Sequence, residues 1–526
     1  ADAGYVVDNI FQSLLRIDFV TLKVVPVLAE ERPLVETTPN NGLRISYTIR
    51  KEAQWDNGKP ITAKDVEFTL KVIKNPLVKN ESSKPYYDFI TGFEFDKKDP
   101  RKFTLICNSI YILAETSSGD YGILPSYVYD PRGWMNDFTV EQLSSHDPSL
   151  VINKKIISFA NDFNSEFRGR DPKLISGSGP YKLAEWKTGE HIRLEKKKNW
   201  WGENLHGTNC FFDAYPGTIV YQVINDAISA QVASKAGNID VMFGIKTDDF
   251  MALQKSETAM KRLNFFTPIS FSYSYLGINT KLPKFSSKKT RQALAYLTDA
   301  KGMLKYLMNG FGQRIVGPIH PSDTLNYNNE LEPYDFSIEK AKEFLSKDGW
   351  SDSNGDGIID KMINGKREEF TIRFTVNAGN DLRKMTALAF QEDALKVGIK
   401  VDVVLQDWSV YLEKEKHHDF ELYFGAWISA PVPYDPMQIY HTSSANGGSN
   451  YTSFGDPASD SLIECIRKEL DEKKRAVLYK RLQEILYDEV PYIYLWAPVE
   501  RIVVNRKFEH PLISSERPGF WPASFH

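Results

Sequence analysis

The order of predicted strands and helices is the feature that most constrains the fold. Short runs with the character of β-strands alternate with helical segments of moderate length along most of the chain. Residues 44–50 alternate polar and apolar side chains, which is typical of a half-buried strand. The turn sequence 56–60 follows, and Thr62 is suited to cap a helix that Asn75-Pro76 would end. This alternation indicates an α/β fold.

The same order returns in the second half of the chain. The predicted elements are a helix capped by Ser337, a helix over 382–397 closed by Gly398, a strand over 399–405 and a helix over 474–486. No short-period repeat and no low-complexity linker separates these elements. Ordinary strands must therefore join any lobes, and the pattern is compatible with discontinuous domains.

Length and composition bound the number of domains and exclude some protein classes. A chain of 526 residues is too long for one ordinary core, which favours two or three packed units. No apolar run approaches the ~18–20 residues that cross a bilayer, and the residues after Ala1 lack the pattern of a signal peptide. The 65 basic and 69 acidic residues nearly cancel, so the basic excess typical of a nucleic-acid-binding protein is missing.

The residues that most often bind metals show no metal-binding pattern. Cys107, Cys210 and Cys465 lie far apart, without the spacing of a zinc site, and allow at most one disulfide. Residues 352–357 resemble the start of a calcium loop, but Ile363 stands where a bidentate glutamate is needed. We therefore expect a polar turn there and neither a metal nor a cofactor.

Motifs of common enzymes are also missing. There is no Walker loop, no His-Glu-x-x-His, no Cys-x-x-Cys and no Gly-x-Ser-x-Gly elbow. Carboxylate pairs stay open as an alternative, because folding can unite two acids from any part of the chain. We expect no catalytic residue. The 31 Phe, 26 Tyr and 10 Trp instead favour a pocket that holds ligands without reacting with them.

Several segments carry a family resemblance. Residues 55–68, Trp-Asp-Asn-Gly-Lys-Pro-Ile-Thr-Ala-Lys-Asp-Val-Glu-Phe, are similar to a signature of cluster C solute-binding proteins, the oligopeptide- and dipeptide-binding family of ABC importers. Further matches are 177–183 continuing to Trp200-Trp201, 291–299, Gly349-Trp350, 398–401, Asp407-Trp408 and 488–492. The matches are collinear over nearly the whole chain, which makes their combination specific.

The resemblance implies an α/β, two-lobed periplasmic-binding-protein-like fold (type II) with an extra inserted domain. One discontinuous lobe would comprise 1–19, 168–269 and 497–526, the inserted domain 20–167 and the distal lobe 270–496. Hinge crossings would fall near Thr267-Pro268 and 496–498. The ligand would bind in a cleft between the lobes, which would close around it.

The function implied by the resemblance is transport, not catalysis. The protein would be a monomer in the periplasm or elsewhere outside the cytoplasm, with or without a lipid anchor. It would capture a peptide or a related small solute and deliver it to a membrane permease of an ABC transporter. Two alternatives stay open: a hydrolase (peptidase or glycosidase) on the same scaffold, and a ligand-sensing or chaperone subunit.

The sequence departs from the family pattern at one position. In peptide-binding members, the third residue after a cleft tryptophan is an aspartate that binds the free amine of the peptide. Here that tryptophan is Trp427, and the third residue on is Ala430. Loss of a charge-assisted bond removes about 1.5–3 kcal/mol and leaves a buried ammonium unpaired. Either Asp435 substitutes for the missing acid, or the ligand has no free amine at this place.

We predict ligand contacts from the aromatic and polar residues near these matches. The candidates are Trp408, Trp427, Tyr434, Asp435, Tyr273, Tyr275, Asn450 and Tyr451. For each of them, the alternative to ligand contact is packing in the core. Tyr273 and Tyr275 are an example. They alternate with Ser272 and Ser274, so they share one face of a strand.

Overall fold

The chain folds into two compact units. The computed structural model describes residues 2–80, 83–166 and 168–526. Unit 1 comprises Ala1–Phe243, Leu253–Phe266 and Ile502–His526, and unit 2 comprises Gly244–Ala252 and Thr267–Arg501. The chain thus changes unit after Phe243, Ala252, Phe266 and Arg501. The three-part division with an inserted domain stays a prediction.

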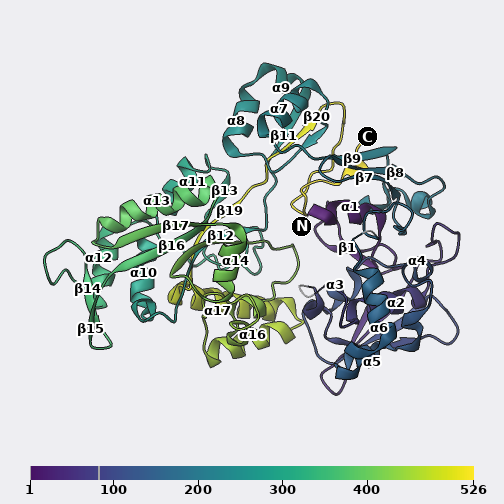
Figure 1. Cartoon of the computed structure of the whole chain (residues 1–526), viewed down its shortest axis with the longest axis horizontal. Coiled ribbons are helices and arrows are strands. Elements are labelled where there is room, and N and C mark those ends of the chain that lie inside the picture. Colours follow the sequence, from purple (N-terminus) through teal and green to yellow (C-terminus); the bar gives the residue numbers. More distant parts are fainter. Residues whose placement is uncertain (1, 81–82, 167) are drawn as a thin grey trace. The chain divides into compact units, whose positions relative to one another are not determined.

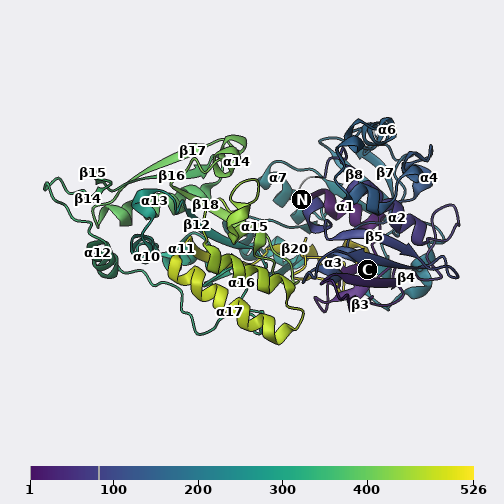
Figure 2. The same ribbon diagram turned by 90° about the horizontal axis from the view of Figure 1, so that it is seen from below.

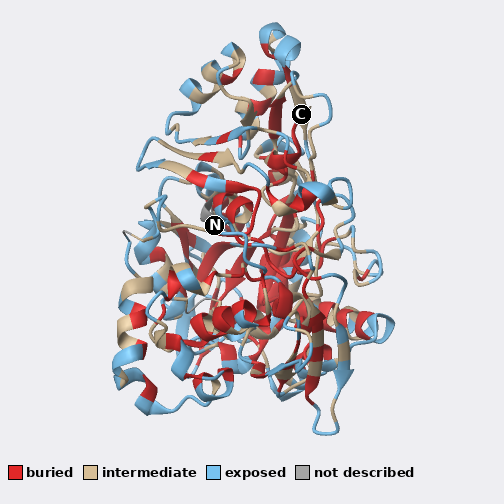
Figure 3. Cartoon of the chain, turned by 90° about the vertical axis from the view of Figure 1, so that its right-hand side faces the viewer, coloured by how far each residue is buried: buried red, intermediate tan, exposed pale blue. Residues whose placement is uncertain are grey.

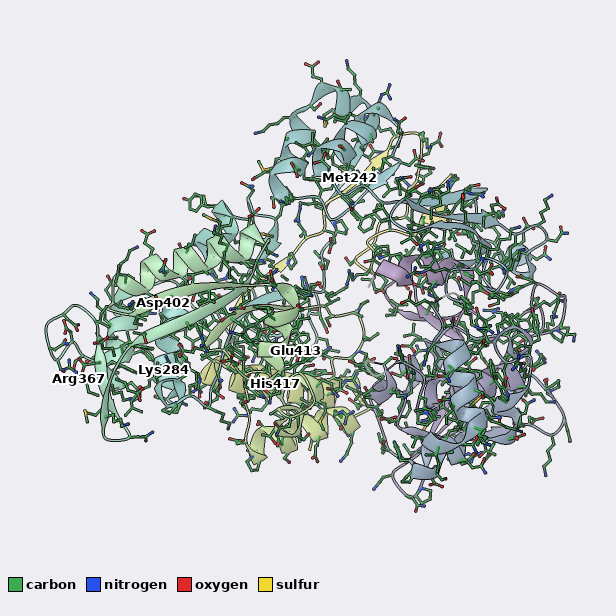
Figure 4. All side chains as sticks on the ribbon, viewed as in Figure 1. Met242, Lys284, Arg367, Asp402, Glu413 and His417 are labelled. Carbon is green, nitrogen blue, oxygen red and sulfur yellow. The ribbon has the colours of Figure 1, made fainter. Side chains whose placement is uncertain are left out.

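The described residues of unit 1 form three sheets of three or four strands and a two-stranded sheet of β1 (Leu15–Ile17) and β2 (Val24–Pro26). The four-stranded sheet has the order β3 (Leu34–Thr37), β4 (Leu43–Thr48), β6 (Lys102–Cys107) and β5 (Ile90–Phe95). The strands β7 (Tyr181–Lys187), β8 (His191–Lys196) and β9 (Thr218–Gln222) form a second sheet. In the third sheet, β20 (Ile502–Asn505) lies between β10 (Val241–Met242) and β11 (Leu263–Phe266), so a C-terminal strand completes this unit (Figures 1 and 4).

The first family signature builds the start of a helix. Helix α2 (Ala63–Lys74) follows Thr62, as predicted, and ends at Asn75. One carboxylate oxygen of Asp65 accepts a hydrogen bond from the Thr62 backbone N–H at 2.8 Å, and the other accepts one from Trp55 Nε1 at 3.3 Å. Burial raises the pKa of Asp65, while these bonds oppose that rise. Strand β4 likewise confirms the predicted half-buried strand.

The family match at 177–183 packs closely against the backbone of the N-terminal helix in unit 1. A Cβ atom on Gly177 would lie 2.3 Å from the carbonyl oxygen of Ile10, and one on Gly179 would lie 2.5 Å from that of Asn9. Only glycine fits at such distances. The Nε1 atoms of Trp200 and Trp201 both donate to the carbonyl of Ser178, at 2.8 and 2.9 Å. These residues therefore hold the backbone of unit 1 together.

Unit 2 is organised around a six-stranded mixed sheet (Figure 1). Its order is β13 (Gly312–Gln313), β19 (Tyr492–Pro498), β12 (Tyr273–Ile278), β18 (Leu422–Trp427), β16 (Thr371–Asn377) and β17 (Lys400–Gln406). Strand β12 is antiparallel to both neighbours, whereas β16 is parallel to β17 and β18. Helix α13 (Asp381–Leu395) connects β16 to β17 and packs on both. Both α13 and β17 were predicted.

Unit 2 contains further helices. They are α10 (Lys288–Tyr296), α11 (Ala300–Tyr306), α12 (Ile338–Lys347), α14 (Trp408–Lys416), α15 (Met437–Tyr440), α16 (Pro457–Lys468) and α17 (Glu472–Glu489). Ser337 caps α12 as predicted, its hydroxyl accepting from the Lys340 N–H. Helices α16 and α17 lie side by side (Figure 2). No helix in the described ranges is long and apolar enough to cross a bilayer.

One face of the central strands is aliphatic. Leu276 and Ile278 of β12 belong to the main core of unit 2, together with residues of β16, β17, β18 and β19 and of helices α10 to α13. All six residues of β12 are buried. Figure 3 colours the chain by burial and shows buried residues on many of its strands and helices. Burial of each such aliphatic side chain contributes about 1.5–3 kcal/mol to folding. The opposite face of the same strands is lined by tyrosines.

The predicted polar turn lies in unit 2 between α12 and β14 (Asp360–Ile363). The two carboxylate oxygens of Asp352 accept hydrogen bonds from the N–H groups of Gly355 and Gly357, at 2.7 and 3.0 Å. The carboxylate of Asp360 pairs with Arg367 at 2.7 Å. These oxygens are engaged within the turn and its neighbouring hairpin, so the residues form the tight polar turn expected from the sequence.

Candidate functional site

Tyrosines line the second face of the central strands in unit 2. Residues at alternate positions point to the same side of a sheet, and on this side β12, β18 and β19 carry Tyr273, Tyr275, Tyr423, Tyr492 and Tyr494. All are buried. A buried phenol needs a hydrogen-bond partner, and here most partners are other phenols.

Two glycines make room for two of these rings. In the register of β12 and β18, Tyr275 pairs with Gly425, and Gly277 pairs with Tyr423. A Cβ on Gly425 would lie 2.3 Å from Cζ of Tyr275, and one on Gly277 would lie 2.1 Å from Cε1 of Tyr423. Each ring therefore lies over the glycine of the other strand, and the two phenol oxygens lie 3.0 Å apart.

A second group of phenols extends this face through α15. The Oη atoms of Tyr440 and Tyr494 are 2.7 Å apart, and Oη of Tyr273 lies 3.5 Å from those of Tyr440 and Tyr434. Burial raises the pKa of all four phenols well above its usual value. They therefore stay neutral and can both donate and accept hydrogen bonds. We name the seven tyrosines of these groups, 273, 275, 423, 434, 440, 492 and 494, the tyrosine cluster.

Trp427 lies at the end of β18, beside the cluster. Its Nε1 donates to Oη of Tyr492 at 3.4 Å. Its ring stacks on that of Tyr451 with centroids 6.0 Å apart and planes 23° apart. Tyr492 in turn stacks on Tyr275 at 3.9 Å. The fold thus brings together four aromatic residues, three of which, Trp427, Tyr451 and Tyr275, are sequence-predicted site residues.

Trp408 begins α14 and is 52% exposed. Its ring stacks on the buried Tyr411 at 5.7 Å, and the guanidinium of Arg383 lies 5.7 Å from the Trp408 ring and 5.8 Å from the Tyr411 ring. Tyr411 donates to the carbonyl of Phe424 on β18 at 2.5 Å. This predicted residue therefore presents an exposed indole on a rigid aromatic and cationic support.

Asp435 already has two partners within unit 2. Its Oδ2 pairs with Nε of Arg467 on α16 at 3.0 Å, and its Oδ1 accepts from the Met437 N–H at 3.0 Å. The neighbouring Tyr434 carbonyl accepts from Oη of Tyr479 on α17 at 2.6 Å. A ligand amine would have to compete with Arg467 for this carboxylate. The role of Asp435 as an amine partner stays a prediction.

Asn450 is fully buried and holds the loop that carries Tyr451. Its Nδ2 donates to the carbonyls of His441 and Phe454, at 3.0 and 2.8 Å, and its Oδ1 accepts from the Phe454 N–H at 3.1 Å. These bonds fold the loop back on itself. The geometry therefore gives Asn450 a supporting role for Tyr451, and its direct contact with ligand stays a prediction.

Glu415 belongs to this region but lies in no motif that the sequence predicted as part of the site. Glu415 lies on α14, one turn after Tyr411, and is only 6% exposed. Burial raises its pKa to about 7, although Tyr411 and Arg383 oppose the rise. Burial, and to a smaller extent the charge of Glu415, raises the pKa of tyrosines from three strands, one helix and one loop: Tyr275, Tyr423, Tyr492, Tyr411 and Tyr451. The i, i+4 spacing from Tyr411 was the only signal that could have found it.

The described ranges hold no cluster of three or more His, Cys, Asp or Glu side chains arranged to bind a metal ion. All three cysteines are free, with Cys107 and Cys210 buried and Cys465 exposed. The candidate residues are neutral phenols, the indoles of Trp408 and Trp427, the amide of Asn450 and the carboxyl groups of Asp435 and Glu415. These groups are suited to hold a ligand through hydrogen bonds and ring contacts.

Comparison with known proteins identifies the family. The family described as "Bacterial extracellular solute-binding proteins, family 5 Middle" matches residues 23–451. The chain belongs to this family. It is therefore an extracellular solute-binding protein and not an enzyme, and the hydrolase alternative is set aside.

The relatives of this solute-binding protein bind several kinds of solute. The oligopeptide-binding protein AppA of Bacillus subtilis is 28% identical over 97% of this chain and 84% of the relative. The dipeptide-binding protein of Escherichia coli is 21% identical over 92% of this chain and 83% of the relative. The heme-binding protein A of Haemophilus influenzae is 25% identical over 69% of this chain and 64% of the relative.

Solved structures confirm the fold of this solute-binding protein. The structure of Bacillus subtilis AppA in complex with a nonapeptide matches with a TM-score of 0.74 at 24% identity, covering 100% of this chain and 94% of that one. The oligopeptide-binding protein of Thermus thermophilus, complexed with a pentapeptide, matches with a TM-score of 0.72 at 23% identity, covering 100% and 91%. The expected α/β, two-lobed periplasmic-binding fold is thus confirmed.

Proposed function

We propose that this protein is the peptide-capturing subunit of an ABC importer. The observation that carries the proposal is the tyrosine cluster with Trp427 and Tyr451, all within unit 2. Peptide backbones offer both hydrogen-bond donors and acceptors, and a neutral phenol can bond to either. Stacked aromatic rings give contact area that tolerates many side chains. The names of the oligopeptide- and dipeptide-binding relatives support the same solute class.

The eight residues predicted from the sequence form the core of this proposed site. Trp408, Trp427 and Tyr451 would supply aromatic walls, and Tyr273, Tyr275 and Tyr434 would supply hydroxyls or support for them. Asn450 would hold Tyr451 in place, and Asp435 would orient its loop through Arg467. We further propose a three-part domain layout and capture by hinge closure, with hinge crossings near 267–268 and 496–498.

The proposal extends to partners and location. A membrane permease would receive the loaded protein, which would act as a monomer outside the cytoplasm. Pull-down of the permease from detergent-solubilised membranes by the peptide-loaded protein, but not by the empty protein, would support this part of the proposal.

Native mass spectrometry of freshly purified protein tests the solute class. We expect complexes with peptides of mixed sequence, and the same peptides recovered intact after denaturation. Addition of a synthetic peptide mixture should yield new complexes without cleavage products. Retention of haem or of a metal chelate in place of peptides would contradict the proposal. It would point instead to the solutes named for other relatives.

A further inference from the structure

Glu415 is a buried acid without a structural ion-pair partner. In the described part of the chain, no cation lies within 4 Å of its carboxylate to form a salt bridge, whereas neighbouring cations are engaged elsewhere. Lys414 pairs with Asp419 at 3.7 Å, and Lys416 pairs with Glu413 at 3.2 Å. Buried carboxylates are normally paired, because an isolated buried charge is costly. The carboxyl group of Glu415 has a hydrogen-bond partner in the phenol of Tyr411, but no cation pairs with it among the described residues.

Arg383 is a cation whose charge lowers the pKa of Glu415, and it is engaged in other contacts. Its Nη1 donates to Oδ1 of Asn377 at 2.9 Å. Its guanidinium also lies 5.2 Å from the ring of Phe424, in addition to its contacts with Trp408 and Tyr411. The pKa of Glu415 stays raised to about 7 in spite of Arg383, so this cation compensates the carboxylate only in part.

The surroundings of Glu415 are those of the candidate site. Glu415 lies one turn after Tyr411, whose Oη donates to the Phe424 carbonyl on β18 at 2.5 Å, and the Glu415 carbonyl accepts from the His418 N–H at 3.1 Å. The His418 ring in turn contacts the Tyr451 carbonyl at 2.7 Å. The groups that titrate or carry charge near Glu415 are Arg383, Tyr411, Tyr275, Tyr423, Tyr492 and Tyr451. Four of these phenols belong to the tyrosine cluster or to the Trp427 stack. The acid therefore lies among the aromatic residues proposed to hold the solute.

A peptide brings an ammonium group that must be neutralised if it is buried. Position 430 holds alanine, and the carboxylate of Asp435 pairs with Arg467. We propose that Glu415 provides the negative charge that binds a positively charged group of the solute, which makes this a site for cationic ligands. The inference rests on the proposed function. It differs from the sequence-level hypothesis, in which Asp435 was the acid.

The positive group could come from the peptide terminus or from a side chain. Both are ammonium groups of the same chemistry, so the experiment uses probes that separate them. The probes are penta-alanine with a free amino terminus, N-acetyl-penta-alanine, and N-acetyl-penta-alanine with lysine at the third position. Binding of only the first indicates the terminus, and binding of only the third indicates the side chain.

Isothermal titration of the wild type, Glu415→Gln and the control Glu413→Gln with these probes tests the proposal. Glu413 lies on the same helix but is exposed (Figure 4). We expect Glu415→Gln to weaken binding of the cationic probe at least tenfold and Glu413→Gln to leave it unchanged. Equal affinity of the wild type and Glu415→Gln for that probe would overturn the inference while leaving the proposed peptide function intact.

A measurement on the wild type alone gives an independent readout. Near pH 7 the Glu415 carboxyl is partly protonated, so binding of a cation should displace its proton. Titrations in two buffers with different ionisation enthalpies should show proton release, and Glu415→Gln should abolish it. Binding of the cationic probe without proton release would contradict the inference. Failure of all three probes to bind the wild type would reject the proposed peptide function, and this inference with it.

Discussion

The phenol oxygen of Tyr275 lies 3.0 Å from that of Tyr423, and each ring occupies the space above the glycine that faces it on the neighbouring strand. This reciprocal arrangement needs Gly425 under one ring and Gly277 under the other. It couples the packing of β12 to that of β18 in the middle of the unit 2 sheet. The candidate site therefore rests on the same contacts that hold the sheet together.

Gly425→Ala tests this coupling. The new methyl group would lie 2.3 Å from Cζ of Tyr275, so the ring must shift. We expect a loss of about 1–3 kcal/mol in the free energy of unfolding, measured by urea denaturation. Gly217→Ala is the control, because a Cβ there meets nothing within 4 Å. Equal stability of the two variants would show that the rings do not depend on the glycine.

Glu415→Gln should change the pH dependence of stability. The pKa of Glu415 is about 7 in the folded protein and near 4.5 in the unfolded chain, so the folded state binds its proton more tightly. The stabilisation from this proton is present below pH 4.5 and is lost as the pH rises through 7. At pH 8, Glu415→Gln should therefore be more stable than the wild type by about 3 kcal/mol.

The difference between the two proteins isolates this effect, since Asp120 and Glu516 also have pKa values raised to about 7 and affect both equally. Thermal unfolding at pH 4 and pH 8 measures it. A gain in stability of the same size at both pH values would assign the effect to packing and not to charge.

Asp435→Asn separates the two candidate acids. Because Asp435 pairs with Arg467, the variant should lose about 1.5–3 kcal/mol of stability. If Glu415 binds the ammonium group, the affinity of Asp435→Asn for penta-alanine should equal that of the wild type. A tenfold loss of affinity, about 1.4 kcal/mol, would instead assign the amine to Asp435. Calorimetry of the folded variant decides between these results.

Trp427→Ala should weaken binding of every peptide probe, charged or neutral. The change removes the indole that stacks on Tyr451 and donates to Tyr492. Truncation of an aromatic contact at the centre of a binding site costs about 2 kcal/mol or more, which is over tenfold in affinity. Trp186→Ala on β7 of unit 1 is the matched control and should bind normally. An unchanged affinity of Trp427→Ala would remove this residue from the site.

Peptide binding should stabilise and compact the protein. A ligand at a hundredfold excess over its dissociation constant contributes about 2.7 kcal/mol by mass action. Thermal unfolding with increasing penta-alanine measures this gain. Small-angle scattering of the same samples should show a smaller radius if capture proceeds by hinge closure. A stabilised protein with an unchanged radius would argue against closure.

The sequence by itself determined the elements whose causes are local. Ser337 starts a helix because its hydroxyl accepts a hydrogen bond from an N–H of the first turn, and Thr62 starts one because its own N–H donates to the carboxylate of Asp65 in the first turn. The half-buried strand at 43–48 follows from alternation alone. The collinear family motifs led to the α/β fold and to the solute-binding function, which the family match then confirmed.

Only the tertiary structure decided which charges are buried and which partners they have. The sequence offered Asp435 as the acid of the site, yet Arg467, on a separate helix, is bonded to it. It gave no reason to choose Glu415 over Glu413, since both lie on the same helix and only one is buried. The pairing of Tyr275 with Gly425 likewise depends on the register of strands nearly 150 residues apart. Burial and strand register are properties of the packed chain, because each is set by segments that are distant in the sequence.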